Sequence, residues 1–279
     1  MKALALLLLL LAAPALAADP TIPAPATPHR TPAPGPAQAI GGNASGCVAG
    51  AVRLPDIAPG MQTIRQRQSH FWGHPDAVAQ LLLLAERTRA AGLPDLYMND
   101  ISNPRGGPMA GHASHQRGIE ADVWLDITPP HPPLSAAQRE TIQPVSLVRP
   151  DGRAVDPARW KPGHITLLRL AATLPRVDRL LVNPAIKKQL CQEVTGDRSW
   201  LRLVRPWYGH AAHFHIAFTC PAGSPLCTQP PPPPPGDGCD ATLQWWFEPR
   251  EPSPATPGPR KPPRLPAACA PVMAAPDKG

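Results

Sequence analysis

Proline restricts the folding of this chain more than any other residue. The sequence has 43 prolines among 279 residues, concentrated at 20–36, 230–235 and 249–266. Proline fixes φ and has no N–H to donate, so such segments favour extended, solvated backbone with little to bury. We therefore predict one packed domain at 40–247, between a proline-rich N-terminal segment at 18–39 and a proline-rich tail at 248–279.

The N-terminus has the pattern of a cleavable secretory signal. Lys2 precedes an apolar run at 3–13, and Ala15-Leu16-Ala17 ends the stretch before polar residues begin. The apolar run is too short to span a bilayer, and no later stretch reaches the roughly 20 residues that a span requires. We predict a signal peptide at 1–17 and an exported protein without a transmembrane segment.

Six cysteines follow this signal, and an even number in an oxidising compartment predicts three disulfides. Spacing alone does not select among the possible pairings. Cys220 and Cys227 flank a short turn and can close a small loop, and a bridge from Cys47 to Cys269 would tie the tail to the domain. The alternative of zinc bound by cysteines is disfavoured because the chain has no CxxC pair.

The formal net charge of +7 predicts attraction to polyanions. For an exported protein the nearest candidates are cell-wall peptides and anionic lipid surfaces. Simple solubility of a proline-rich chain explains the charge equally well. Nucleic-acid binding is disfavoured because the basic residues are scattered and no aromatic-basic motif is present.

Apolar periodicity predicts an α+β domain. The segment 119–126 alternates apolar and acidic positions with a period of two, which predicts a strand with Glu120 and Asp122 on one face. The other predicted elements are a helix at 75–92, a strand at 96–98, a loop at 99–118, helical segments at 157–174 and 176–194, and strands at 201–207 and 213–219 joined by a tight turn around Gly209. Asn183-Pro184 marks a break or a new helix start within the second helical segment. Without a regular βαβ alternation, we predict a small antiparallel sheet with flanking helices.

Histidines cluster at two places, which indicates a metal site. Five of the ten lie in two short stretches, GHASHQRGIEADVWL with His112 and His115, and GHAAHFHIAF with His210, His213 and His215. His112 can be a further ligand, a hydrogen-bond partner for substrate or an ordinary loop residue.

The ligands of this site are predicted to be His115, Asp122 and His215. They converge if the strands at 119–126 and 213–219 are neighbours, with His213 beside the metal on the face that it shares with His215. Three nitrogen and oxygen ligands leave one tetrahedral position for water, as in catalytic zinc sites. The HExxH pattern is absent, so the general base is open, with His213 first and His210 second as candidates.

At these residues the chain resembles a known superfamily. The H-x6-D pair and the later HxH are similar to lysostaphin-type endopeptidases, D-Ala-D-Ala metallopeptidases and hedgehog domains. Within that group, GHASHQ, the RPW before the HxH, the PPPGDGC segment and all six cysteines resemble the penicillin-insensitive murein endopeptidases, over nearly the whole mature chain from Cys47 to Cys269. No SxxK motif is present, which disfavours a serine penicillin-binding protein.

The resemblance implies a hedgehog/DD-peptidase-like fold and a periplasmic enzyme that hydrolyses the D-alanyl to meso-diaminopimelyl crosslink of peptidoglycan. It implies zinc on His115, Asp122 and His215, catalytic roles for His213 and His210, and metal contact by His112. The implied disulfides are Cys47–Cys269, Cys191–Cys239 and Cys220–Cys227.

Glu120 departs from the pattern, since close relatives are expected to have Asp there; it can orient a ligand or alter substrate contact. Two rival functions remain: a D-Ala-D-Ala carboxypeptidase or dipeptidase with the same metal centre, and a non-catalytic zinc-containing wall-binding module. The sequence leaves the oligomeric state open, a homodimer included.

Overall fold

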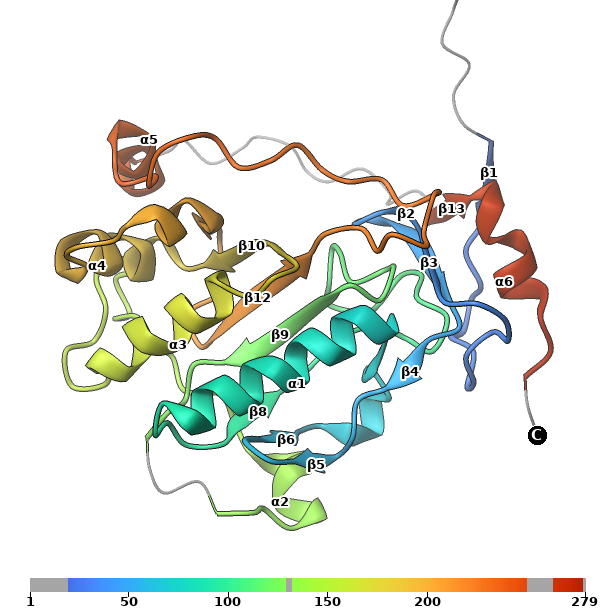
Figure 1. The fold of residues 1–279 in the computed structure, drawn as a ribbon, viewed down its shortest axis with the longest axis horizontal. Coiled ribbons are helices and arrows are strands. Elements are labelled where there is room, and N and C mark those ends of the chain that lie inside the picture. The colour runs from blue at the N-terminus through green and yellow to red at the C-terminus, as the bar shows by residue number, and fades with distance from the viewer. Residues whose placement is uncertain (1–19, 129–131, 250–262, 278–279) are drawn as a thin grey trace, which may run out of the picture.

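The computed structural model describes residues 20–128, 132–249 and 263–277, so the predicted signal peptide at 1–17 lies outside the described residues. The described chain is α+β (Figure 1). Its α-helices are α1 (Pro75–Ala90), α2 (Ala136–Thr141), α3 (Pro162–Ala172), α4 (Pro184–Glu193), α5 (Ala241–Gln244) and α6 (Ala270–Ala274). The 3-10 helices are η1 (Gln66–Gln68), η2 (Ser199–Leu203), η3 (Trp245–Phe247) and η4 (Ala267–Cys269). None of these helices is long and apolar enough to cross a membrane.

The main sheet has seven strands in the order β11-β10-β12-β9-β8-β6-β5. Its strands are β5 (Ile57–Ala58), β6 (Met61–Thr63), β8 (Leu96–Met98), β9 (Glu120–Trp124), β10 (Val177–Val182), β11 (Val204–Pro206) and β12 (His213–Phe218). The pairs β6–β8 and β10–β11 are parallel and the other pairs are antiparallel. The prediction of a small antiparallel sheet was therefore wrong, because it lacked β5, β6 and β10 and could not detect pairing between strands distant in sequence.

The segment 176–194, predicted to be helical with a break or a new helix start at Asn183-Pro184, is a strand before that point and a helix after it. In β10, the buried residues Asp178, Leu180 and Val182 alternate with partly exposed ones, a period of two that fits a strand. Asn183 then accepts a hydrogen bond from the backbone N–H of Ala185 and starts α4, with a proline in its first turn. The leucines of β10 fit either period, and the tertiary pairing of β10 with two strands selects the extended form.

The predicted hairpin of strands 201–207 and 213–219 was also wrong. Residues 199–203 form η2, and only 204–206 extend as β11. β10 lies between β11 and β12, parallel to the first and antiparallel to the second. The turn around Gly209 therefore crosses over the end of β10 and does not join two neighbouring strands.

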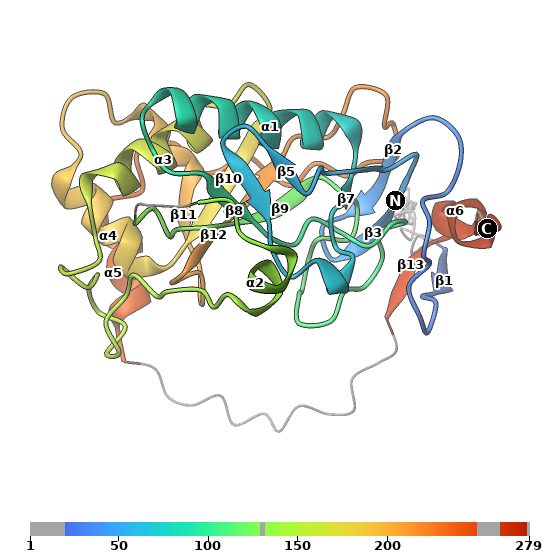
Figure 2. The ribbon, with the colours of Figure 1, turned by 90° about the horizontal axis from the view of Figure 1, so that it is seen from below.

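Helices α1 and α3 lie side by side over one face of the sheet, as Figure 2 shows. Ala121 and Val123 of β9 point to that face, because they belong to the same apolar cluster as Leu81 of α1 and Leu168 of α3. Adjacent side chains of a strand point to opposite faces. Asp122 therefore points away from these helices.

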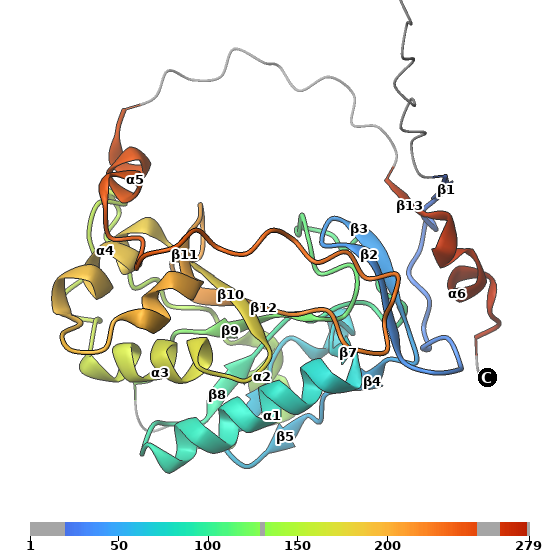
Figure 3. The ribbon, with the colours of Figure 1, turned by 45° about the horizontal axis from the view of Figure 1, so that its top comes forward.

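Both proline-rich ends contain paired strands. β1 (Thr21–Pro23) pairs with β13 (Arg264–Pro266), beside the hairpin of β2 (Gln38–Gly42) and β3 (Ser45–Ala49). These elements and α6 lie at the opposite end of the molecule from α5 (Figure 3). A further short pair is β4 (Val52–Arg53) with β7 (Trp72–Gly73).

Disulfides and a buried arginine fasten these ends. The structure contains the bridges Cys47–Cys269, Cys191–Cys239 and Cys220–Cys227, which are the pairings that the resemblance implied. Arg105, almost fully buried, donates hydrogen bonds to the carbonyls of Thr31 and Pro276 and pairs with Asp277. The two terminal segments are thus tied to the same side chain.

Candidate metal centre

Neighbouring strands bring the predicted ligands together. β9 and β12 pair directly, with Asp122 opposite His215 and Trp124 opposite His213. The loop before β9 delivers His115 to the same point, and all three predicted ligands are buried. The condition for convergence stated from the sequence, that the two strands be neighbours, is met.

Three ligand atoms form a compact triangle. His115 Nε2 lies 3.0 Å from His215 Nδ1 and 3.4 Å from Asp122 Oδ1, and His215 Nδ1 lies 3.2 Å from that oxygen. Ligand atoms about 2.0–2.1 Å from a tetrahedral zinc ion are roughly 3.3 Å apart. Two imidazole nitrogens and one carboxylate oxygen at these separations therefore fit a zinc ion.

The backbone around His115 fixes which of its nitrogens faces this triangle. Nδ1 lies 3.0 Å from the carbonyl oxygen of Ile101, which can only accept, so Nδ1 carries a proton and Nε2 is the nitrogen that offers a lone pair when the ring is neutral. His115 has a φ of 67°, a left-handed conformation that non-glycine residues seldom adopt. Its backbone N–H donates to Glu120 Oε2 at 2.7 Å. Glu120, the position at which the sequence departs from the family pattern, thus holds the backbone of a predicted ligand in place.

The electrostatics favour positive charge in the triangle. Burial lowers the pKa of His115, but the charge and hydrogen bond of Asp122, together with Glu120 and the Ile101 carbonyl, outweigh burial and raise the pKa to about 9. Burial raises the pKa of Asp122, but charge and hydrogen bonding from His115 and His215 hold it well below its usual range. Both shifts are those expected where a buried carboxylate attracts a cation.

His112 lies beside the triangle and is held by a residue that sequence reasoning missed. His112 Nε2 is 3.1 Å from Asp100 Oδ2, and His112 Nδ1 is 3.7 Å from Asp122 Oδ2. Asp100 Oδ1 also accepts from His70 Nδ1 at 2.8 Å. Burial raises the pKa of Asp100, but the hydrogen bonds from His112 and His70 outweigh it and lower the pKa to about 2. Besides the triangle, two overlapping groups bring potential ligand atoms close together: His112, His115 and Asp122, and His115, Glu120 and His215.

The two predicted catalytic histidines lie next to the same centre. His213 Nε2 is 3.7 Å from Asp122 Oδ2, and the rings of His210 and His213 are 5.0 Å apart. His210 Nδ1 donates to the carbonyl oxygen of Tyr208 at 2.7 Å, which leaves Nε2 as an acceptor. Burial lowers the pKa of His213 and lowers that of His210 to about 3, with nearby histidines adding to the effect for His210. Both imidazoles are therefore neutral at neutral pH.

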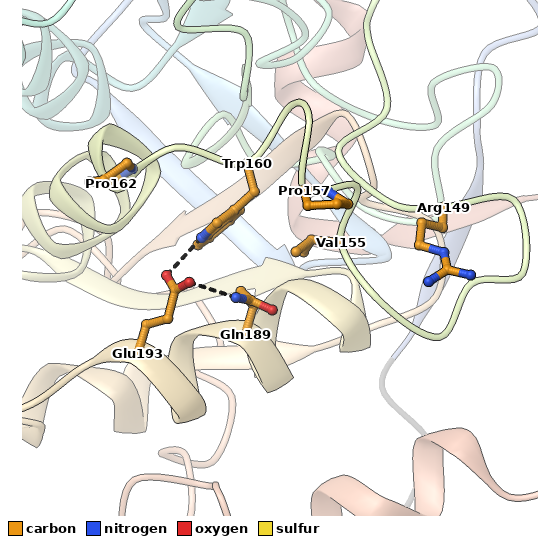
Figure 4. A pocket seen from close by; sticks show the side chains of 7 residues that line it. All are labelled: Arg149, Val155, Pro157, Trp160, Pro162, Gln189 and Glu193. Carbon is orange, nitrogen blue, oxygen red and sulfur yellow. Dashed lines mark hydrogen bonds between the residues drawn. The ribbon is translucent and has the colours of Figure 1, made fainter.

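All six predicted site residues line one pocket of about 240 Å³, together with Trp207 and Tyr208. A larger hollow of about 390 Å³ lies between the segment 149–162 and α4 (Figure 4). There, both oxygens of Glu193 already accept hydrogen bonds, from Trp160 and Gln189. That hollow contains none of the predicted residues.

Sequence reasoning assigned none of Asp100, His70, Trp207 and Tyr208 to the site, although Trp207 belongs to the RPW motif that contributed to the resemblance. The one available indication was position: Asp100 comes two residues after the predicted strand 96–98, so it lies where that strand ends beside β9. Trp207 and Tyr208 directly precede the second histidine stretch. His70 gave no indication in the sequence.

The sequence matches a family model and named relatives over most of its length. The family model described as penicillin-insensitive murein endopeptidase matches residues 39–274. Proteins of that name are similar to the chain in Yersinia enterocolitica (44% identity, covering 85% of the chain and 86% of the relative), Citrobacter koseri (43%, 96% and 95%) and Escherichia coli (42%, 96% and 95%). The chain therefore belongs to the penicillin-insensitive murein endopeptidase family.

Proposed function

We propose that the protein is a zinc-dependent murein endopeptidase that hydrolyses the D-alanyl to meso-diaminopimelyl crosslink of peptidoglycan in the periplasm. The observation that carries the zinc assignment is the triangle of His115 Nε2, Asp122 Oδ1 and His215 Nδ1, with mutual distances of 3.0–3.4 Å. The names of the relatives supply the substrate class. Export through the signal at 1–17, a catalytic domain at 40–247 and a hedgehog/DD-peptidase-like fold belong to the same proposal.

Zinc is the metal that this donor set suits, because imidazole and carboxylate ligands in a three-residue site are typical of catalytic zinc. When bound, a zinc ion would polarise the scissile carbonyl and make water a stronger nucleophile at neutral pH. The pocket lies beside these ligands, so a substrate carbonyl can reach them from it.

His213 is the proposed proton carrier. Its neutral imidazole can accept a proton from the attacking water at Nε2, the atom 3.7 Å from Asp122 Oδ2, and return it to the leaving amino group. The Tyr208 carbonyl holds the Nδ1 proton of His210, so His210 acts by accepting a hydrogen bond at Nε2. His112 is held by Asp100, and from this position its ring can contact either Asp122 or the substrate.

Digestion of purified crosslinked muropeptide dimers, with products identified by mass, tests this proposal. We expect the wild type to convert dimers to intact monomers, and chelation or His215→Ala to abolish the conversion. His213→Ala should bind zinc normally and lose turnover. His29→Ala is the matched control, because His29 lies in the N-terminal segment beside Asp277, and it should cleave like the wild type.

Other outcomes select the rivals. Release of single D-Ala residues from uncrosslinked pentapeptides, with dimers left intact, would show a carboxypeptidase. A zinc-loaded protein that binds walls but cleaves nothing, with full binding retained in His213→Ala, would show a wall-binding module.

A further inference from the structure

Four aromatic side chains form a continuous cluster at the edge of the metal pocket. The Trp246 ring lies 6.0 Å from that of Trp207, 4.8 Å from that of Tyr208 and 5.2 Å from that of Trp245. Trp207 and Tyr208 follow β11, whereas the other two belong to η3, directly after α5. We call Trp207, Tyr208, Trp245 and Trp246 the aromatic platform.

The aromatic platform is unusually exposed for a group of large aromatic side chains. Trp207, Tyr208 and Trp245 are 51%, 55% and 48% exposed. Among the described residues, seven large apolar side chains are exposed, and these three are the only aromatic ones. Aromatic side chains gathered on a surface typically mark an interaction site, because their faces gain most from being covered.

The platform is also held in place. Cys239 is bridged to Cys191 of α4 just before α5 begins, and Asp240 accepts a hydrogen bond from the backbone N–H of Thr242 at the start of that helix. Leu243, in the same turn, is buried. The rings are therefore presented on a fixed support, so that little conformational entropy is lost when a ligand covers them.

The platform begins where the proposed chemistry takes place. Trp207 and Tyr208 line the metal pocket, and the carbonyl of Tyr208 orients the proposed catalytic His210. From Tyr208 the rings continue through Trp246 to Trp245, which does not line that pocket. A ligand that lies along the platform therefore enters the metal pocket at one end.

We propose that the aromatic platform binds the glycan strand of murein, while the attached stem peptide enters the metal pocket; this inference rests on the proposed function. A pyranose ring has an apolar C–H face that covers an aromatic ring, and its hydroxyl edges stay hydrated beside the polar atoms of Trp and Tyr. A four-residue stem spans at most roughly 14 Å. Trp245, two ring contacts beyond Tyr208, is within that reach of the pocket.

The test compares two forms of one substrate: crosslinked muropeptide dimers that carry their disaccharides, and the same dimers after an amidase has removed the sugars. The measured quantity is the ratio of kcat/KM for the two dimers. We expect the wild type to prefer the sugar-bearing dimer and Trp245→Ala to reduce that ratio about fivefold, the effect of losing one stacked ring. Trp245→Phe keeps a ring and should retain most of the preference.

Leu226→Ala is the matched control, since Leu226 is 53% exposed in a different surface hollow and should leave the ratio unchanged. An equal ratio in the wild type and Trp245→Ala would overturn the inference. A wild-type preference for the sugar-free dimer would instead assign the platform to the peptide.

A second measurement separates failure of this inference from failure of the proposed function. Binding of peptide-free glycan strands should be about fivefold weaker in Trp245→Ala than in the wild type, whether or not dimers are cleaved. Equal binding by the two proteins would overturn the platform even if both cleave the sugar-free dimer.

Discussion

Glu120 supports the candidate metal centre without lining the pocket, and Glu120→Gln tests that role. Glu120 is fully buried; its Oε2 accepts the His115 backbone N–H at 2.7 Å and lies 3.7 Å from His215 Nε2. Its Oε1 lies 3.8 Å from Nε of the buried Arg117. The carboxylate thus fixes one ligand and balances the nearest cation.

Glutamine keeps the volume and an oxygen that can accept the His115 N–H, but it removes the negative charge. The positive charge of Arg117 is then less compensated and opposes a second cation nearby. We expect the zinc affinity to fall by about 10–100-fold, or about 1.4–2.8 kcal/mol, as for other groups that support metal ligands. Glu120→Ala also leaves the buried His115 N–H without its acceptor, which should reduce the free energy of unfolding by about 1–3 kcal/mol.

Competition for zinc against a chromophoric chelator measures the affinity, and urea unfolding measures the stability. Glu86→Gln on the exposed face of α1 is the matched control and should change neither quantity. If Glu120→Gln binds zinc as tightly as the wild type, the negative charge of Glu120 has no role in the centre.

Three further predictions concern stability. Burial lowers the pKa of Lys187 from 10.5 to about 7, so between pH 7 and pH 10.5 the unfolded chain binds a proton that the folded protein lacks. The free energy of unfolding should therefore rise with pH in this range, by up to ~1.4 kcal/mol per pH unit. Lys187→Met should flatten that rise when urea unfolding is measured at several pH values. Asp100→Asn should lower the free energy of unfolding by about 2 kcal/mol, since two partly buried hydrogen bonds to a charged group weaken; an unchanged urea midpoint would refute this. Replacing Cys47 and Cys269 by Ala opens a bridge across 222 residues and should cost up to about 5 kcal/mol, measured against the intact protein without reductant.

The sequence could predict the proposed ligands because local patterns determine their geometry. Asp122 and His215 are at fixed places in strands of period two, and His115 lies in the loop that leads into the first of these strands. The family resemblance supplied what pattern alone left open, namely the disulfide pairing, which the structure contains. The leucine-rich segment 177–182 was ambiguous between helix and strand, since short apolar runs fit both periods.

Only the tertiary structure determined which distant segments meet. The parallel pairs β6–β8 and β10–β11 join segments whose partners no local pattern specifies. The same long-range packing brings Asp100 to His112 and places Trp246 against Tyr208. Local periodicity specifies the face on which a side chain lies, but the neighbours on that face depend on the order of strands in the sheet, and that order is set by burial over the whole chain.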